Sequence, residues 1–345
     1  MKEAILLINL GTPDSPSTSD VRKYLTQFLN DKRVIDIGPI GRFFLVNFII
    51  VPFRSSRSAK LYRQIWTKEG SPLLIHTKNL AEKLQLEMGE NYIVDFAMRY
   101  QNPGIVKVLN KLKEAKPAKI SIVPLYPQYA SSSTGSTLEL VMKEISGWEV
   151  IPNISIHSNF YNHPAFINSI VEEAKQYPIN EFDHVLFSYH GLPERHIKKA
   201  SAHYGSNSCD PGSPKNKCCE TVTSNNQFCY RANCYATTRQ LVKQLNIPEG
   251  KFITTFQSRL NDNWLKPYSD KTIEELAKKG AKKILVFSPA FVVDCLETIY
   301  EIGTEYNELF KKHGGESVTL AKSLNDNATW IKALKEIIIP ITIET

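Results

Sequence analysis

Short runs rich in Val, Ile and Leu alternate along the chain with longer stretches in which apolar residues recur every three or four positions. Strands that alternate with helices in this way are typical of βαβ units and a parallel sheet. The strands predicted on this basis cover residues 4–10, 92–97, 119–124, 150–157, 184–189, 252–257, 283–287 and 317–321, and helical periodicity is clear over 103–115 and 272–279. The sequence therefore predicts an α/β fold whose ligand site lies beyond the carboxyl ends of the strands.

The predicted strands fall into two sets of four with similar turns after them. The first strand of each set is followed by a Gly-x-Pro-acid turn, at residues 11–14 and 191–194, and the second by an arginine and an asparagine. This indicates a weak internal duplication, although βαβ proteins also reuse such turns without one. We expect two similar domains over 1–160 and 161–322, each with a four-stranded parallel sheet flanked by helices, and one cleft bordered by both sets of strand ends.

The composition and charge exclude several classes of protein. An apolar fraction of 42% and a mean hydropathy of −0.26 exclude a polytopic membrane protein, and 10% aromatic residues argue against disorder. The formal charge of +7 comes from Lys and Arg residues spread along the chain, so we expect no nucleic-acid partner. An anionic small ligand or an acidic membrane surface fits this spread better. The apolar run before Gly11 is too short for a signal peptide, which predicts a cytoplasmic protein.

Residues 40–53 form the most apolar segment, interrupted by Arg42 and Asn47. The segment is too short to cross a bilayer, which needs about 20 apolar residues. It is either an ordinary buried helix or an apolar lip that dips shallowly into a membrane. The second interpretation draws on the cations that follow it, which would face lipid headgroups: Arg54, Arg57 and Lys60.

His190 ends an apolar strand and precedes Gly191. At a strand end of a doubly wound fold, its side chain is expected to point into the ligand crevice, where glycine allows close backbone approach. Imidazole accepts protons or ligates metals near neutral pH. The alternative is a packed histidine with a structural role. We interpret His190 as functional.

Asp294, Glu297 and Glu301 follow the predicted strand 283–287 at spacings of three and four, which would place them on one face of a helix. A solvated acidic face is the simplest explanation. The residues around them are largely apolar, however, so this face does not fit open water. Carboxylates crowded in a cleft act as proton acceptors or as ligands of hard metal ions.

Residues 126–136 are dense in hydroxyl groups and follow a predicted strand. Such a loop can bind phosphates or carboxylates, but it lacks the Gly-Lys-Ser/Thr core of a P-loop. Together with Arg99, it indicates an acidic ligand that is flat or large.

Five of the six cysteines lie in a polar insertion over residues 198–234 that lacks periodicity: Cys209, Cys218, Cys219, Cys229 and Cys234. Disulfides are disfavoured in the cytosol, so ligation of a metal by thiolates is the leading interpretation. Four of these thiolates could hold Zn²⁺ or a [2Fe–2S] cluster, and the spacing matches no standard zinc finger. Redox-sensing or incidental cysteines are the alternative.

Two motifs are highly specific in their order and separation: Ser188-Tyr189-His190-Gly191-Leu192-Pro193 and Asp294-Cys295-Leu296-Glu297-Thr298-Ile299-Tyr300-Glu301. With the stretches given below, they resemble the ferrochelatases, lyases that insert Fe²⁺ into a porphyrin at the last step of haem synthesis. The resemblance implies two Rossmann-like domains of the chelatase fold and a C-terminal helix within 323–345 that packs back on the first half. Further matching stretches are 6–13, 22–36, 65–66, 70–73, 98–103, 126–135, 256–259 and 264–268.

The resemblance also implies roles for individual residues. His190 and Glu297 would form the pair at the site of metal insertion, with Glu301 and Asp294 extending an acidic path for Fe²⁺ and protons. His190 would either accept a pyrrole proton or ligate the incoming iron. The candidate porphyrin contacts are Arg99, Tyr126, Tyr129, Ser136 and Arg259.

Departures from the family pattern refine these expectations. Relatives that act on coproporphyrin usually carry tyrosine where Leu10 stands, which favours protoporphyrin IX as the substrate. The cysteine insertion resembles the internal [2Fe–2S] type, with Zn²⁺ as the alternative, and we expect the spare thiol within the pair Cys218 and Cys219. Residues 40–53 resemble the lip by which such enzymes meet a membrane. The alternatives are a coproporphyrin ferrochelatase, a chelatase for another tetrapyrrole, and a non-catalytic haem or iron–sulfur sensor; the sequence predicts no oligomeric state.

Overall fold

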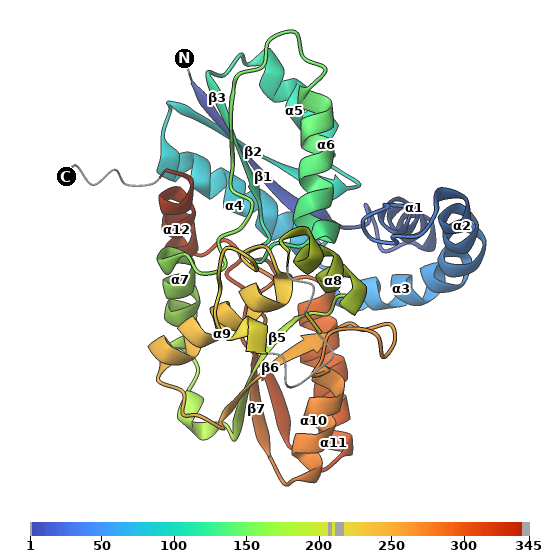
Figure 1. The fold of residues 1–345 in the computed structure, drawn as a ribbon, viewed down its shortest axis with the longest axis vertical. Helices are drawn as coiled ribbons and strands as arrows, with labels where there is room; N and C mark the ends of the chain where they lie inside the picture. Colours follow the sequence, from blue (N-terminus) through green and yellow to red (C-terminus); the bar gives the residue numbers. More distant parts are fainter. Residues whose placement is uncertain (1, 206–208, 211–216, 340–345) are drawn as a thin grey trace, which may run out of the picture. The chain divides into compact units, whose positions relative to one another are not determined.

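The computed structural model describes residues 2–205, 209–210 and 217–339, and its chain divides into two compact units. The first unit comprises the chain up to residue 126 together with 131–159 and the segment from 325 onward. The second unit comprises residues 127–130 and 160–324. Each unit is built around its own sheet (Figure 1).

The sheet of the first unit is parallel throughout and has the order β2-β1-β3-β4. Its central strand is buried on both faces, as parallel sheets covered by helices require, and the run Ala4 to Ile8 is at most 1% exposed. Its strands are β1 (Glu3–Gly11), β2 (Tyr92–Tyr100), β3 (Lys119–Pro124) and β4 (Asn153–Ile156). Its main helices are α1 (Thr18–Leu29), α4 (Pro72–Met88), α5 (Ile105–Glu114), α6 (Ser136–Ile145) and α12 (Ala328–Ile338).

The C-terminal helix α12 packs on α4 within this first unit. Asn327 caps its start, because the Asn327 side chain accepts a hydrogen bond from the backbone N–H of Trp330 (2.8 Å). Trp330 is fully buried, and Lys335 pairs with Glu87 of α4 at 3.0 Å.

The sheet of the second unit repeats the same arrangement, with the order β6-β5-β7-β8 and all strands parallel. In both sheets the first strand lies between the second and the third, so each has its topological switch point at the end of its first strand. In the second unit that end is His190. The strands are β5 (His184–His190), β6 (Phe252–Gln257), β7 (Lys283–Phe287) and β8 (Ser317–Leu320). The main helices are α7 (Pro164–Ala174), α8 (Glu194–His203), α9 (Tyr230–Leu245), α10 (Ser269–Lys278), the π-helix η5 (Glu297–Tyr306) and α11 (Asn307–Lys312). The predicted fold class is confirmed.

The apolar segment 40–53 lies on a continuous helical stretch formed by α2 (Pro39–Phe44), the π-helix η1 (Leu45–Ile50) and α3 (Val51–Ile65). The interpretation as a buried helix is wrong, because Phe48 is 62% exposed and Phe53 is 82% exposed. We call the exposed side chains of this segment the apolar lip: Ile40, Phe43, Phe44, Phe48, Ile49 and Phe53. No helix among the described residues is both long and apolar enough to cross a bilayer.

Three local expectations were wrong. Strand β4 begins at Asn153 rather than at residue 150, because the preceding Val150 and Ile151 lie exposed at the surface. The polar insertion begins inside α8, so its first residues up to His203 are helical. Asp294 precedes the helix that carries Glu297, and the three carboxylates therefore do not share one helix face.

Candidate active site

His190 stands at the carboxyl end of β5, half-buried, with its ring centroid 6.2 Å from that of Phe291. Its Nδ1 lies 2.7 Å from the carbonyl oxygen of Gly191. A carbonyl oxygen can only accept, so Nδ1 carries a proton, and in the neutral ring the lone pair is then on Nε2. The ring therefore presents a nitrogen that can take up a proton or bind a metal ion.

Gly191 meets a close approach of the neighbouring strand. Its N–H donates to the carbonyl oxygen of Gln257 over 2.7 Å. A Cβ atom at this position would lie 2.7 Å from the same oxygen and 3.4 Å from the Trp264 ring. Only glycine fits without displacing the backbone of β6.

Gln257 joins the strand that ends in His190 to the helix that begins at Glu297. It pairs with His190 in the register of β5 and β6, and it is 1% exposed. Its Nε2 donates to the backbone oxygen of Glu297 (2.9 Å), and its Oε1 accepts from Ser188 Oγ (2.8 Å). The buried amide thus links Ser188, two residues before His190 in β5, to the backbone of Glu297.

Glu301 is held by several donors one turn further along η5. Its carboxylate accepts from the Ser258 N–H (2.8 Å), the Ser258 hydroxyl (2.5 Å) and the Tyr306 hydroxyl (2.8 Å). Burial and this carboxylate raise the pKa of Tyr306 far above its ordinary value, so the phenol stays a donor. Ser258 has a φ of 61°, an uncommon conformation for a residue with a side chain.

Asp294 lies before the helix and is 9% exposed. Its carboxylate accepts from Thr298 Oγ1 (3.0 Å) and from the N–H of Ser323 (3.4 Å). Next to it, burial and the carboxylate of Glu297 raise the pKa of the Cys295 thiol well above its ordinary value. Glu297 itself is half-buried at the first position of η5.

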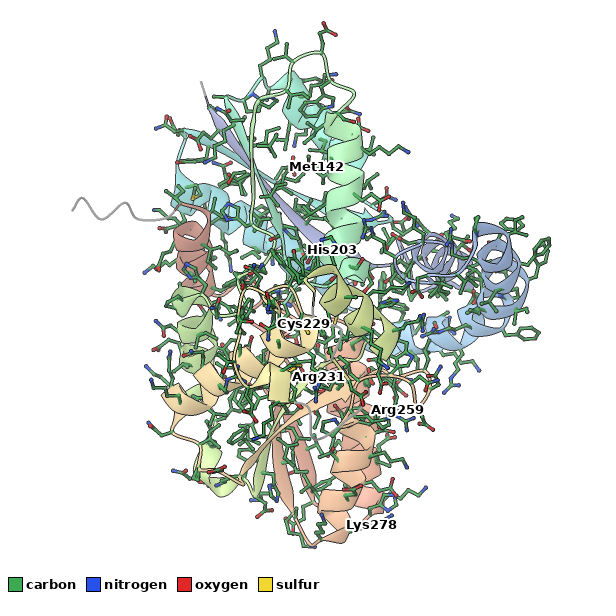
Figure 2. The ribbon with its side chains drawn as sticks, viewed as in Figure 1. Met142, His203, Cys229, Arg231, Arg259 and Lys278 are labelled. Carbon is green, nitrogen blue, oxygen red and sulfur yellow. The ribbon has the colours of Figure 1, made fainter. Side chains whose placement is uncertain are left out.

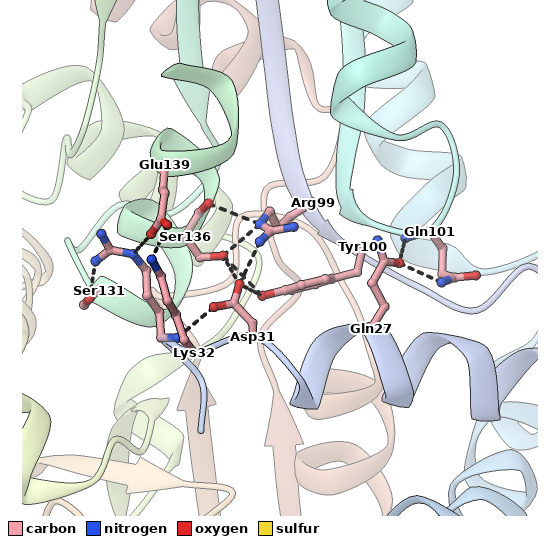
Figure 3. Close-up of polar contacts among 10 residues, drawn as sticks. Gln27, Asp31, Lys32, Arg99, Tyr100, Gln101, Ser131, Ser136 and Glu139 are labelled. Atoms are coloured by element: carbon pink, nitrogen blue, oxygen red, sulfur yellow. Dashed lines mark hydrogen bonds and ion pairs between the residues drawn. The ribbon is translucent and has the colours of Figure 1, made fainter. Parts of the chain in front are cut away.

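Two of the candidate porphyrin contacts, Arg99 and Ser136, belong to a buried ionic network of the first unit (Figure 3). Arg99 pairs with Asp31 over 2.7 Å and donates through Nε to Ser136 Oγ over 2.7 Å. The Tyr100 hydroxyl donates to the same Asp31 carboxylate over 2.9 Å. The structure brings together Arg99 and Ser136, both of which were predicted to contact the porphyrin. The Arg99 guanidinium, however, is already neutralised by the buried carboxylate of Asp31.

The other three candidate contacts have different surroundings. Burial raises the pKa of Tyr126, whose hydroxyl is enclosed in the first unit. Tyr129 belongs to the second unit, where its ring lies 5.4 Å from that of Phe228. Arg259 forms ion pairs with Asp262 (3.1 Å) and Asp270 (3.0 Å).

The cysteines of the insertion gather at the start of α9, where Figure 2 labels Cys229 and Arg231. The Sγ atoms of Cys218 and Cys219 are 3.8 Å apart, and Arg231 Nη1 lies 3.6 Å from Cys219 Sγ. A hydrogen bond from Cys219, aided by the N–H groups at the start of the helix, lowers the pKa of Cys229 to about 7. Burial and the neighbouring thiols of Cys218 and Cys229 raise the pKa of Cys209 to about 11.

All six cysteines are free thiols. Within the described ranges, no group of three or more His, Cys, Asp or Glu side chains is arranged to hold a metal ion. The donor chemistry fits a thiolate-bound metal, because four thiols interact with one another, but they do not form a finished coordination sphere.

Sequence reasoning missed Gln257, Tyr230 and Asp31 as parts of these sites. Gln257 stands at a predicted strand end, which is a usable signal for a functional residue. Asp31 and Tyr230 act through long-range contacts that no local pattern reveals. Tyr230 donates from its hydroxyl to the backbone oxygen of His190 over 2.9 Å.

The chain is similar to known proteins over nearly its whole length. The Ferrochelatase family model matches residues 2–340. The chain is 44% identical over 339 residues to a ferrochelatase of Legionella pneumophila (strain Lens), covering 98% of this chain and 99% of that one. It is 41% identical over 340 residues to a ferrochelatase of Coxiella burnetii (strain Dugway 5J108-111), covering 96% and 92%.

The fold is also similar to that of a solved chelatase. The sirohydrochlorin chelatase SirB from Bacillus subtilis subspecies spizizenii, in complex with cobalt, superposes with a TM-score of 0.54 at 12% identity, covering 98% of this chain and 96% of that chain. At this identity the likeness shows the fold alone, whereas the sequence relatives decide the family. The chain belongs to the ferrochelatase family of metal-chelating lyases.

Proposed function

We propose that this ferrochelatase inserts Fe²⁺ into protoporphyrin IX, with His190 and Glu297 as the residues at the reacting nitrogens. The observation that carries the proposal is the frame around His190, in which Gly191 holds Nδ1–H and leaves Nε2 free, while Gln257 ties the same strand end to Glu297. Rigid placement of a proton acceptor against a reacting atom is a main source of enzymatic rate enhancement.

The release of two protons gives a role to both His190 and Glu297. Two pyrrole N–H protons leave the macrocycle as Fe²⁺ binds its four nitrogens, so the products are protohaem and two protons. Nε2 of His190 can accept one proton or hold the incoming iron, and the Glu297 carboxylate can accept the other. Glu301 and Asp294 are already hydrogen-bonded, which suits them to an acidic path behind the reacting pair rather than to first contact.

Leu10 supports protoporphyrin IX over coproporphyrin as the substrate. Protoporphyrin carries vinyl groups where coproporphyrin carries two further propionates, and a leucine side chain matches a vinyl group better than a carboxylate. We retain Arg99, Tyr126, Tyr129, Ser136 and Arg259 as candidate propionate contacts. Since Arg99 and Arg259 already pair with carboxylates, each would have to share its guanidinium.

The test is an anaerobic assay with Fe²⁺ and either porphyrin, followed by the loss of porphyrin fluorescence and the appearance of haem absorption. Protoporphyrin IX should be metallated with the higher kcat/KM. Faster turnover of coproporphyrin would establish the alternative substrate. Tight haem binding without turnover would favour a sensor on the same fold.

We further propose that four thiolates of the insertion hold a [2Fe–2S] cluster, with Zn²⁺ as the alternative. Mutual contacts support Cys209, Cys218, Cys219 and Cys229 as the ligands. Cys234 is fully buried one helical turn beyond Cys229 and interacts with Tyr230, so we now assign it as the spare thiol. The four ligands would have to draw closer on binding metal. Iron and zinc analysis with a visible spectrum of anaerobically purified protein decides between the two metals.

We also propose that the protein is located in the cytoplasm and that its apolar lip docks peripherally on an anionic membrane surface. Arg54, Arg57 and Lys60 follow the lip and are all exposed. Exposed aromatic side chains beside headgroup-facing cations are typical of interfacial helices.

We also retain the predicted domain division as a proposal. Its parts are a first domain over 1–160, a second over 161–322, and a C-terminal helix within 323–345 that returns to the first domain.

A further inference from the structure

The hydroxyl group of Tyr230 reaches the main chain of His190. Tyr230 is the first residue of α9, is 6% exposed, and donates to the backbone oxygen of His190 over 2.9 Å. A carbonyl oxygen can only accept, so the phenol is the donor in this hydrogen bond.

This hydrogen bond acts on the same peptide group that Gln257 holds from the other side. The peptide between His190 and Gly191 has its C=O bound by Tyr230 and its N–H bound by the backbone oxygen of Gln257. The next carbonyl, that of Gly191, accepts the Nδ1–H of His190. The orientation of the His190–Gly191 peptide therefore sets the position of the Gly191 carbonyl oxygen, and this acceptor selects the tautomer of the His190 ring.

Tyr230 also lies directly beside the cysteines of the insertion. Cys229 occupies the cap position of α9, one residue before Tyr230. The Cys234 thiol, one turn later and fully buried, lies within hydrogen-bonding reach of the Tyr230 hydroxyl. The hydroxyl of Tyr189, the residue before His190 in β5, is instead hydrogen-bonded to the hydroxyl of Thr238 in α9 over 2.9 Å. Only one of the two hydroxyls touches the peptide of His190.

We propose that Tyr230 is a positioning residue for His190, holding the Nδ1–H tautomer through the His190–Gly191 peptide and joining it to the helix that the cysteine insertion leads into. The catalytic consequence rests on the proposed function of His190, whereas the tautomer does not. Removing a partner that orients a metal-ligating histidine typically lowers metal affinity or activity by about 10- to 100-fold.

The test compares Tyr230→Phe with Tyr189→Phe in the full chain. Both substitutions delete one buried hydroxyl between α9 and β5, so a purely structural effect should be similar in the two proteins. The ¹⁵N chemical shifts of the His190 ring, assigned by their loss in His190→Gln, report the tautomer. Steady-state kinetics with Fe²⁺ and protoporphyrin IX separate kcat from KM.

Tyr230→Phe should give a mixture of ring tautomers and a kcat about 10- to 100-fold lower with an unchanged KM for the porphyrin. Tyr189→Phe should keep the Nδ1–H tautomer. An intact tautomer in Tyr230→Phe, or an equal loss of kcat in both variants, would overturn the proposal.

A rescue variant and the turnover of the wild-type chain separate the positioning role of Tyr230 from the proposed function. A protein carrying 4-aminophenylalanine in place of Tyr230 retains a donor on the same ring, so it should restore the tautomer and kcat, and failure to do so in a folded protein would count against the positioning role. A tautomer change in Tyr230→Phe without any turnover by the wild-type chain would support the positioning role while contradicting the proposed function.

Discussion

The side-chain amide of Gln257 donates to the backbone oxygen of Glu297 over 2.9 Å. Gln257 faces His190 in the strand register, and its backbone oxygen binds the N–H of Gly191. A single residue of β6 therefore determines how the histidine at one strand end and the glutamate at the start of η5 are held. The proposed metal insertion would in this way use two residues that are 107 positions apart in the chain, His190 and Glu297.

Replacing Gln257 should disturb stability and catalysis together. Gln257→Leu removes one of the two partners of Ser188 Oγ, which keeps Ser269, and the side-chain donor to the Glu297 carbonyl. A buried polar group left unpaired costs about 1–3 kcal/mol. We expect the free energy of unfolding in urea to fall by about 2 kcal/mol or more, and kcat to fall as well. Gln176→Leu, at an exposed position, is the control and should change neither. Wild-type stability in Gln257→Leu would show that the amide does not hold this frame.

Gly191→Ala tests the close approach of the two strands. The new Cβ would lie 2.7 Å from the Gln257 oxygen, so β5 and β6 must separate locally. Overpacking of this kind costs about 1–3 kcal/mol, and the hydrogen bond to His190 Nδ1 should be displaced with it. Gly147→Ala, where a Cβ atom would lie 3.6 Å from the backbone oxygen of Glu144, is the matched substitution and should be tolerated. Equal effects of the two alanines in thermal unfolding would contradict this geometry.

The cysteine assignment predicts distinct phenotypes for neighbouring thiols. Anaerobically purified protein should be red-brown and contain about two irons per chain. Cys229→Ser should lose the colour, whereas Cys234→Ala and Cys295→Ala should keep it, because neither thiol is assigned as a ligand. Loss of iron from Cys234→Ala with an intact fold would return Cys234 to the ligand set. Colourless wild-type protein with one zinc would favour Zn²⁺.

The apolar lip should bind membranes without contributing to stability. Phe44→Ser combined with Phe48→Ser removes side chains that are 57% and 62% exposed, so the unfolding free energy should hardly change. Co-sedimentation with vesicles that contain anionic phosphatidylglycerol should fall, because the buried apolar area at the interface is lost. Leu86→Ser, at an 83% exposed leucine away from the lip, should sediment like the wild type. Unchanged vesicle binding of the double variant would rule out the lip as the docking surface.

The strands could be predicted because parallel strands buried on both faces read as continuous apolar runs, and β3, β6 and β7 have the predicted limits. β4 was predicted too long, since an exposed pair of β-branched residues, Val150 and Ile151, looks the same in sequence as a strand. Hydrophobic pattern alone does not reveal which apolar residues are covered.

The candidate site could be predicted only in part. His190 and Glu297 stand at a strand end and a helix start, positions that topology makes informative. The contacts that give them their chemistry join segments far apart in the chain, as with Tyr230 and the His190 carbonyl, and local spacing carries no record of them. The same holds for Asp31, whose carboxylate neutralises Arg99 from 68 residues away.

We propose that His190 takes a direct part in metal insertion, and anaerobic turnover of His190→Ala tests this role. The assay follows haem formation from Fe²⁺ and protoporphyrin IX, with His184→Ala, at the opposite end of the same strand, as the matched control. His190→Ala should remain folded and lose at least about 100-fold in kcat, in line with the loss of a general base, while His184→Ala should keep the wild-type rate. A folded His190→Ala protein that turns over at the wild-type rate would contradict this role.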